Sequence, residues 1–369
     1  MDTTESRPSA AARGPGGAIL GFPLEGEPTE LVRLAGGHIN ETYLVTTSAD
    51  RRYVLQRLNA RVFPEAELIM CNVAAVTRYL DSRPAAWPRL IRYMPCLDGD
   101  CFYRDGAGGI WRLYRYVEDC VCLARAERPE DVFECARAFG GFAEALADFP
   151  AEELRETLEG FHDTPRRLRR LEAALASAGG SLPEALRAEA DFALSETARA
   201  SVLQRMRESG ELPLRVTHND TKLSNVLLDA DSRRARCIID LDTVMPGLTA
   251  WDFGDLVRSG AARPSPGGGG GLALDLEYYR FALRGYLEAC PGLSDAEKRA
   301  LPLGVFTMAL ECGVRYLTDH LEGGGYFAAD GAGRDLERAR SQLGLARDVL
   351  EKLGEMERIL RQEDKKTVM

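Results

Sequence analysis

The pattern of hydrophobic and polar positions divides the chain into a β-rich beginning and a mainly helical remainder. From Leu31 to Arg57, short alternating runs flank a glycine turn and a second turn at Ala49-Asp50, which predicts three strands in an antiparallel meander. Glu65 to Leu80 carries apolar residues at helical spacing, and a second hairpin turns at Asp105 to Gly109. These elements predict a small antiparallel sheet with one helix.

The helical part follows a short connector near Glu118. Apolar stripes and caps predict helices from about Asp131 to Phe149, from Thr164-Pro165 to Gly179, and from about Pro183 to Glu208. Three further helices are predicted at the end of the chain, at about Leu274 to Ala289, Ser294 to His320 and Arg334 to Gln362. Between the two helical groups lie short strand-like runs, so we expect an α+β protein.

These patterns also predict how the chain is organised. Residues 1–21 are rich in Ser, Pro, Ala and Gly and are expected to form a disordered tail. Residues 22–117 would form the small β-rich lobe, and residues 118–369 the larger helical lobe. The run from Ala262 to Gly271 has the composition of a flexible loop.

Composition narrows the kind of partner. The chain has 47 Lys and Arg against 57 Asp and Glu, a net charge of −10, which disfavours non-specific attraction to nucleic acid or an anionic membrane. We therefore expect a small-molecule partner. The nine cysteines lack paired metal-ligand spacing, so reduced thiols are expected. No signal segment and no apolar run of membrane-spanning length is evident, which predicts a cytoplasmic protein.

Two neighbouring runs, VTHNDTKLSNVLLD and RCIIDLDTVMPG, carry candidate chemistry. Asp220 is followed five positions later by Asn225 and fifteen further on by Asp240. In phosphoryl transfer from ATP, one carboxylate accepts the proton of the attacking hydroxyl, while an amide oxygen and a second carboxylate hold magnesium against the phosphates. Each residue alone is more often a turn cap or a strand end. The combination favours a kinase.

The same runs resemble the catalytic and metal-binding segments of the aminoglycoside phosphotransferase and choline kinase superfamily, which shares the protein-kinase fold. The segments GGHINETYLV, YVLQRLN, FHDTPRRL, HNDTK, IDLDTVMPG, DFGDLVRSGA and RYLTDHLEGGGYF resemble the N-acetylhexosamine 1-kinase group more closely. The resemblance spans about Leu31 to Phe327. It implies a kinase that phosphorylates the anomeric hydroxyl of N-acetylglucosamine or N-acetylgalactosamine, with ATP and Mg²⁺.

The resemblance implies that Asp220 is the catalytic base and that Asn225 and Asp240 are magnesium ligands. His218 is expected to brace the loop rather than to transfer protons. Lys222 could stabilise charge on the transferred phosphoryl group, or it could be a solvated loop lysine.

The nucleotide site is expected to include Gly36, Gly37, Asn40, Gln56, Val117, Glu118 and Lys222. Two adjacent glycines let backbone N–H groups approach phosphates, although they suit a plain hairpin equally well. Gln56 occupies the position where the superfamily usually has a Lys or Arg. Either Gln56 makes a neutral contact there, or Arg57 supplies the cation from a shifted strand; regular alternation places the two on opposite faces.

The sugar site is expected, from the resemblance, to include His38, Asp220, Asp242, Arg315 and Tyr326. Asp242 lies two positions past Asp240, hence on the same face of a continuing strand, where it could back the metal site or bind a sugar hydroxyl. Asp252 is expected to hold the catalytic loop in place, and Asp255 to give similar support.

The leading hypothesis is therefore an ATP- and magnesium-dependent N-acetylhexosamine 1-kinase that acts as a monomer or homodimer and binds neither nucleic acid nor membranes. A choline-like amino alcohol, an aminoglycoside or another sugar are alternative acceptors. A non-catalytic nucleotide-binding module is an alternative motivated by Gln56. A protein kinase is disfavoured, because the DFG at Asp252 lies too far from the catalytic loop.

Overall fold

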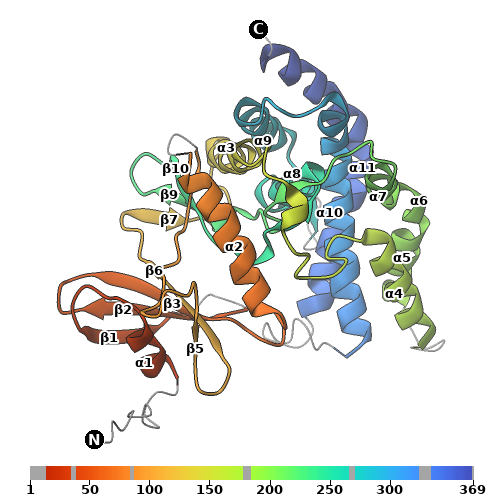
Figure 1. Cartoon of the computed structure of the whole chain (residues 1–369). Coiled ribbons are helices and arrows are strands. Elements are labelled where there is room, and N and C mark those ends of the chain that lie inside the picture. Colours follow the sequence, from red (N-terminus) through yellow and green to blue (C-terminus); the bar gives the residue numbers. More distant parts are fainter. Residues whose placement is uncertain are drawn as a thin grey trace, which may run out of the picture. The chain divides into compact units, whose positions relative to one another are not determined.

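The computed structural model describes residues 14–34, 39–83, 87–177, 184–265, 271–323 and 334–367. The chain divides into two compact units, which are described separately (Figure 1). The N-terminal unit comprises Met1–Ser82 and Leu90–Asp119, and the C-terminal unit comprises Arg83–Arg89 and Cys120–Met369. The short strand β4, Arg89–Leu90, lies where the chain passes from one unit to the other.

The N-terminal unit contains the predicted antiparallel sheet. Its five strands are ordered β1-β2-β3-β6-β5 and every neighbouring pair is antiparallel. The strands are β1 (Pro28–Arg33), β2 (Glu41–Thr47), β3 (Arg52–Arg57), β5 (Tyr103–Arg104) and β6 (Ile110–Arg115). The predicted meander and the second hairpin are thereby confirmed. A long helix, α2 (Ala66–Asp81), is also where the spacing predicts it.

Strand alternation gives this sheet two different buried faces. On one face, Leu55, Trp111 and Leu113 are at most 1% exposed and pack in one cluster with Ala18, Ile19 and Phe22. On the other face lies α2, whose Met70 packs against Leu58 and Ile110. Residues next to each other in the sequence of β3 or β6 therefore point into different surroundings.

Residues 14–21 differ from the predicted tail. They form α1 (Pro15–Ala18) and a 3-10 helix (Ile19–Gly21), and Ala18 and Ile19 are 0% and 3% exposed. The segment is rich in small and polar residues overall, but it ends in the apolar run Ala-Ile-Leu-Gly-Phe, of which Ala18, Ile19 and Phe22 pack against the sheet. Residues 1–13 lie outside the described part of the chain.

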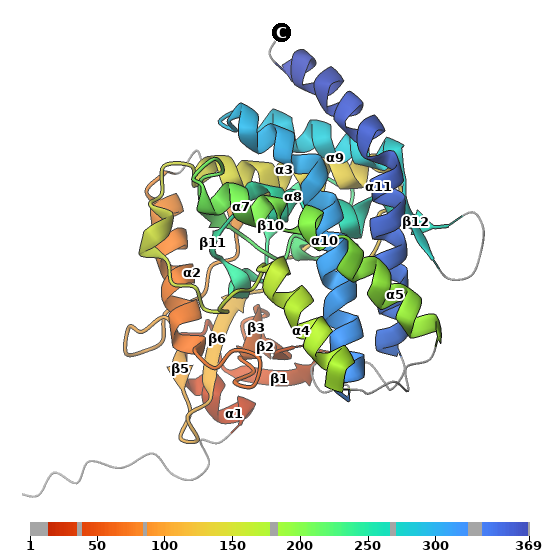
Figure 2. The ribbon, with the colours of Figure 1, turned by 90° about the vertical axis from the view of Figure 1, so that its right-hand side faces the viewer.

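The C-terminal unit is built around helices α3, α8, α9, α10 and α11, which pack on one another in both views (Figures 1 and 2). Their bounds are α3 (Pro129–Ala145), α8 (Thr249–Gly260), α9 (Leu276–Ala289), α10 (Asp295–Leu321) and α11 (Arg334–Thr367). Helix α4 (Thr164–Ser177) packs on α10. The helices predicted in these regions are confirmed, whereas α8 was not predicted.

The predicted long helix from Pro183 to Glu208 is wrong. The described residues of this region form three helices, α5 (Glu184–Ser195), α6 (Thr197–Ala200) and α7 (Val202–Glu208). At the breaks, Ser and Thr side chains donate to nearby backbone carbonyls: Ser195 to Phe192, Thr197 to Leu194 and Ser201 to Thr197. Such bonds offer the backbone an alternative to the regular helical ladder.

Short strands of the C-terminal unit frame its loops. Strand β9 (Val226–Asp229) pairs with β7 (Cys120–Cys122) on one side and β10 (Ala235–Ile238) on the other. Strand β8 (Arg215–Thr217) pairs with β11 (Met245–Gly247), and β12 (Ala262–Pro264) pairs with β13 (Leu272–Leu274). The ends of the predicted flexible loop are therefore a hairpin, and residues 266–270 lie outside the described chain.

Helix α10 corrects the statement that no apolar run in the sequence reaches membrane-spanning length. It is long and apolar enough, by length and composition alone, to cross a membrane. However, 78% of its most apolar window is buried inside the protein, as expected for a helix at the centre of a folded unit. Its apolar residues are accounted for by packing against α8, α4 and α11.

Candidate active site

The run that carries the candidate catalytic residues forms a loop between two short strands. Strand β8 ends at Thr217, the loop continues to a 3-10 helix at Leu223–Asn225, and β9 begins at Val226. Strand β10 ends at Ile238 beside β9, so that Asp240 follows closely on the same side of the unit. The two separated sequence runs are thereby brought together.

His218 supports this loop from the buried interior of the unit. Its ring is fully buried and packs edge-on against Phe139, with ring centroids 5.2 Å apart. Its Nδ1 accepts a hydrogen bond from the Asp220 N–H (3.3 Å), and Nε2 donates to the Ile239 carbonyl (3.0 Å). Burial lowers the pKa of His218, which agrees with one protonated nitrogen. The geometry is that of a neutral bracing residue.

Asp252, at the start of α8, holds the loop from a second direction. Its two carboxylate oxygens accept from the backbone N–H groups of His218 (2.8 Å) and Asn219 (2.7 Å). Burial raises the pKa of Asp252 to about 7, although both N–H donors act against that rise. The predicted role of Asp252 agrees with these contacts. Asp255 instead pairs with Arg258 of the same helix (2.8 Å).

Asn219 makes the tight backbone conformation at this point possible. It has a positive φ of 63°, a conformation that asparagine tolerates better than most residues. Its Nδ2 donates to the Thr243 carbonyl (2.9 Å), and the Thr243 hydroxyl donates to the His218 carbonyl (2.6 Å). Sequence analysis did not assign a role to either residue; their position beside Asp220 and Asp242 was the available signal.

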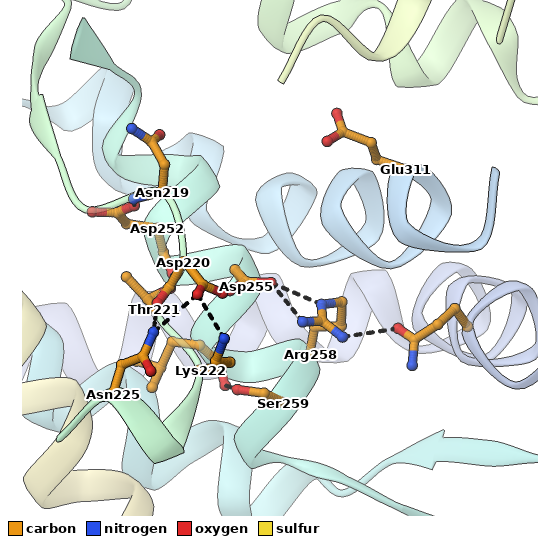
Figure 3. Close-up of polar contacts among 12 residues, drawn as sticks. Asn219, Asp220, Thr221, Lys222, Asn225, Asp252, Asp255, Arg258, Ser259 and Glu311 are labelled. Carbon is orange, nitrogen blue, oxygen red and sulfur yellow. Dashed lines mark hydrogen bonds and ion pairs between the residues drawn. The ribbon is translucent and has the colours of Figure 1, made fainter. Parts of the chain in front are cut away.

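Asp220, Lys222 and Asn225 point toward one another (Figure 3). The Lys222 ammonium lies 2.7 Å from Asp220 Oδ2 and 3.9 Å from Asp240 Oδ2. Burial alone would raise the pKa of Asp220, but the Lys222 ammonium and the Asn225 amide hold it below its usual value. The carboxylate is therefore ionised at neutral pH and remains 29% exposed.

Asp240 and Asp242 depart from the predicted strand. Asp240 is in the left-handed conformation, with φ 62° and ψ 57°, and Leu241–Thr243 form a 3-10 helix. The Asp240 side chain is 38% exposed, whereas Asp242 is only 3% exposed. Their placement on one face of a continuing strand is wrong, because the chain leaves the strand at Ile238. Asp242 is as deeply buried as Asn225, which is also 3% exposed, and its predicted role at the metal or sugar site stays a prediction.

The oxygen donors of this loop are of the kind that a divalent cation prefers. Asn225 Nδ2 donates to the Asp220 carbonyl (2.8 Å) and to Asp220 Oδ2 (3.0 Å), so its Oδ1 is the atom available to a metal. Asp240 supplies a second oxygen donor. Within the described residues, no group of three His, Cys, Asp or Glu could hold a metal ion. Two protein oxygens, completed by water and phosphate, are what magnesium prefers.

A buried ionic cluster connects α10 to the same loop. His162 Nδ1 lies 2.9 Å from Glu311 Oε1, and His162 Nε2 lies 3.3 Å from the Asn219 carbonyl. Thr164 donates to the second oxygen of Glu311 (2.7 Å), and Arg167 lies 3.4 Å from Glu311. Sequence analysis missed His162 and Glu311; a charged residue within the apolar run MALECGV was the signal that could have found Glu311.

Arg315 lies one helical turn beyond Glu311 on α10. Its guanidinium is 5.3 Å from the ring centroid of Phe161, the residue before His162, and its charge helps to lower the pKa of Glu311. Among the predicted sugar-binding residues, Arg315 is thus adjacent to the cluster that reaches the catalytic loop. Tyr326 and His38 lie outside the described residues.

The predicted nucleotide-binding residues of the N-terminal unit are dispersed along its sheet. Asn40 Oδ1 accepts from the Asn59 N–H (3.0 Å), which ties the start of β2 to the loop after β3. Val117 is half-buried, and Glu118 is exposed and paired with Arg52 (2.9 Å). Gly36 and Gly37 lie outside the described residues.

Gln56 and Arg57 lie on opposite faces of β3, as strand alternation predicts. Arg57 faces the cluster that contains Trp111, with its guanidinium 5.7 Å from the Trp111 ring centroid and 3.5 Å from Glu41. Gln56 lies on the face covered by α2 and accepts a hydrogen bond from Arg112 (2.9 Å). The register between β2, β3 and β6 is regular here, so a shifted strand that would exchange the two residues is excluded.

Comparison with known proteins gives one family and a set of similar folds. The model of the phosphotransferase enzyme family (APH) matches residues 30–288. An aminoglycoside phosphotransferase from Alicyclobacillus acidocaldarius subsp. acidocaldarius is 15% identical, with a TM-score of 0.62 over 97% of this chain and 99% of that chain. A microcompartment-associated aminopropanol kinase is 19% identical, with a TM-score of 0.63 over 91% of this chain and 96% of that chain.

An amicoumacin kinase solved with AMP-PNP, Ca²⁺ and its antibiotic is 14% identical, with a TM-score of 0.58 over 88% of this chain and 90% of that chain. At these identities the likeness concerns the fold. It confirms the predicted kinase-like fold, with an antiparallel sheet in the N-terminal unit and a mainly helical C-terminal unit.

Proposed function

The chain belongs to the phosphotransferase enzyme family, and from this premise we propose that it transfers the γ-phosphoryl group of ATP to the anomeric hydroxyl of an N-acetylhexosamine. The Lys222 ammonium and the Asn225 amide both donate to the Asp220 carboxylate. This arrangement is the observation that carries the proposal. Ordinary packing gives no reason to gather an ionised aspartate, an ammonium group and an amide in a loop braced from two directions.

The roles of these residues follow from their contacts. Lys222 and Asn225 both donate to Asp220 Oδ2, so Oδ1 is the oxygen that takes the proton of the acceptor hydroxyl. A carboxylate is a weak base, which suits phosphoryl transfer because the transition state requires positioning and charge stabilisation more than covalent chemistry. Lys222 also faces Asp240 and places a positive charge where the transferred group carries negative charge.

Magnesium, when bound, would neutralise charge on the phosphates and hold them in line with the acceptor. Asn225 Oδ1 and the Asp240 carboxylate would hold it. His218 and Asp252 fix the backbone on either side of Asp220, so the oxygens of this chain are oriented before ATP arrives.

Arg315 favours a sugar over a cationic acceptor. Its guanidinium carries a fixed positive charge beside Phe161, and a guanidinium offers several donors to hydroxyl or acetamide oxygens. The ammonium group of an amino alcohol or aminoglycoside has no acceptor for these donors. The likeness of RYLTDHLEGGGYF to the N-acetylhexosamine 1-kinase group supports the same acceptor.

The chemistry is tested with Asp220→Asn. The expected result is a loss of turnover of at least about a hundredfold, the usual contribution of a general base, with ATP binding retained. Steady-state ADP release and calorimetric titration of ATP measure the two quantities. Retention of turnover in this variant would contradict the proposed role of Asp220.

The acceptor is tested with a panel of N-acetylglucosamine, N-acetylgalactosamine, choline, ethanolamine, aminopropanol and one aminoglycoside. We expect ADP release with one or both N-acetylhexosamines and a 1-phosphate product by ³¹P NMR. Phosphorylation of an amino alcohol or aminoglycoside, with both amino sugars untouched, would leave the kinase chemistry standing and refute the proposed acceptor.

A further inference from the structure

Both ring nitrogens of His162 face hydrogen-bond acceptors. Nδ1 lies 2.9 Å from the Glu311 carboxylate, and Nε2 lies 3.3 Å from the Asn219 carbonyl. A neutral imidazole has one N–H donor and one bare nitrogen, and only the doubly protonated ring donates from both nitrogens. A neutral ring would turn a nitrogen lone pair toward one of these two oxygens. The ring therefore needs both protons to satisfy its two contacts.

The surroundings of His162 stabilise the charge that two protons give it. The residue is 5% exposed, and burial by itself disfavours a charged histidine. The neighbouring Glu311 offsets this cost. Burial alone would raise the pKa of Glu311, but the charges of His162, Arg167 and Arg315 hold it at about 2, so the carboxylate is ionised. Thr164 donates to its other oxygen (2.7 Å), which leaves Oε1 directed at the His162 ring.

Asp252 is the charged group that α8 places near His162. The ring of Trp251, the residue before Asp252, lies beside the His162 ring with centroids 5.3 Å apart. Burial raises the pKa of Asp252 to about 7, against the effects of the His218 and Asn219 N–H groups and of the His162 charge. His162 thus supplies positive charge to two carboxylates, one on α10 and one on α8.

The carbonyl that His162 contacts belongs to the peptide unit that joins Asn219 to Asp220. Its other polar group, the Asp220 N–H, donates to His218 Nδ1 (3.3 Å). Because a peptide unit is planar and rigid, rotating it would break both contacts at once. Glu311 lies on α10, apart from Asn219 and Asp220 (Figure 3), and the His162 ring contacts both sides. The peptide before the candidate base is therefore held at each end by a histidine.

We propose that His162 is a positioning residue of the catalytic loop, held as a buried imidazolium by Glu311 and donating its second ring N–H to the peptide before Asp220. The two histidines then act in opposite protonation states: His218 is neutral and accepts, whereas His162 is charged and donates. The inference rests on the proposed function, because it takes Asp220 as the catalytic base.

The protonation state is tested on the full-length protein by NMR correlation of the ring nitrogens with the ring C–H protons. The chain has four histidines, and the signals of each are assigned by its own replacement with Gln. If His162→Gln does not fold, its signals are those left after the other three are assigned. At neutral pH we expect both nitrogens of His162 to be protonated and one nitrogen of His218 to be bare. A bare nitrogen on His162 would overturn the inference.

The positioning role is tested by kinetics with whichever acceptor the protein phosphorylates. His162→Gln removes the charge and retains at most one of the two contacts. We expect kcat to fall about tenfold or more, the usual loss when a hydrogen bond to a charged group is removed. The KM for ATP should change by less than about twofold, because the altered contacts orient Asp220. Melting temperature establishes that the variant is folded.

Glu311→Gln separates positioning by charge from a purely structural role. Without the carboxylate, the imidazolium loses its proton at lower pH, so the alkaline fall of kcat should move down by about one pH unit or more. The ring nitrogens should show the same move by NMR. The control is Arg166→Gln, which breaks an exposed ion pair with Glu159 on the same side of α4 (3.0 Å) and should leave kcat and its pH profile unchanged.

Two kinetic results would overturn the positioning role alone. One is an unchanged kcat in a folded His162→Gln. The other is a lower kcat in Glu311→Gln with no move of the alkaline fall, which indicates that the cluster only maintains the fold. If the unaltered protein phosphorylates no acceptor, the proposed function fails and the positioning role fails with it, while the NMR result still decides the protonation of His162. Transfer to an acceptor other than a hexosamine refutes only the proposed function.

Discussion

At the scale of single residues, the contacts of Lys222 bear on the two interpretations of its side chain. A solvated loop lysine would extend away from its neighbours, but the Lys222 ammonium lies 2.7 Å from Asp220 and 3.9 Å from Asp240. The two carboxylates raise the pKa of Lys222, although burial opposes the rise. The charge is therefore held in place beside the candidate base.

Replacement of Lys222 by Met should lower kcat by about a hundredfold, comparable to the loss of one donor that stabilises transition-state charge. The free energy of unfolding should change by less than about 1 kcal/mol, because partly exposed ion pairs contribute little to stability. Lys222→Arg, which retains the charge, is the matched control. Steady-state kinetics and urea denaturation measure both effects; kcat within a few-fold of the unaltered protein would refute the role.

Single residues also mark how far the sequence could predict the site. The spacing of Asp220, Asn225 and Asp240 suggested that they act together, and the structure places the Asn225 amide 3.0 Å from the Asp220 carboxylate; their catalytic and metal-binding roles stay predictions. The left-handed conformation of Asp240 was not predictable, since it depends on where β10 stops pairing. Arg112 belongs to no motif, and only the register of β3 and β6 places it beside Gln56.

At the scale of secondary structure elements, α8 matters because it carries Asp252 to the catalytic loop. Its position is set by a close approach to α10: a Cβ on Gly304 would overlap the Ala250 carbonyl, and a Cβ on Gly254 would overlap the Gly304 carbonyl. Neither contact is with a flexible side chain. The two helices can lie this close only where both residues lack a side chain.

Gly304→Ala should therefore push α8 away from α10, with a loss of about 1–3 kcal/mol from overpacking and a lower kcat as Asp252 moves. The control is Gly344→Ala in α11, where nothing lies within 4 Å of the added Cβ. That variant should gain about 0.5–1 kcal/mol, because alanine favours a helix interior over glycine. Urea denaturation compares the two; equal effects would contradict the close-packing argument.

Helices were predicted well from periodicity where an apolar stripe faces a buried core, as in α2, α3 and α9. The prediction failed between Pro183 and Glu208 because Ser195, Thr197 and Ser201 interrupt the backbone ladder. Periodicity did not predict α8, because residues that contact the catalytic loop, such as Asp252, interrupt its apolar stripe. Local sequence patterns therefore predict best those helices that pack on a single apolar surface.

At the scale of the whole molecule, Glu311 couples the central helix α10 to the catalytic loop through charge. It is 1% exposed and contacts His162, Thr164 and Arg167. Burial alone would raise the pKa of Glu311, but His162 and Arg167 lower it to about 2. Because Glu311 stays ionised to a lower pH in the folded protein than in the unfolded chain, the free energy of unfolding depends on pH.

The direction of this dependence follows from linkage. Because the folded pKa of Glu311 is about 2 and the ordinary value is 4.5, its stabilisation is complete above about pH 4.5 and is lost as the pH falls toward 2. The difference between the two pKa values corresponds to about 3 kcal/mol of stability as an upper figure.

Glu311→Gln lacks this contribution, so it should be less stable than the unaltered protein at pH 7. The gap between the two free energies of unfolding should narrow below pH 4.5. Urea denaturation at several pH values between 7 and 3.5 measures the gap, with Asp148→Asn, which alters a 79% exposed carboxylate, as the control. A gap that stays constant over this range would mean that the stabilising contacts of Glu311 do not depend on its charge.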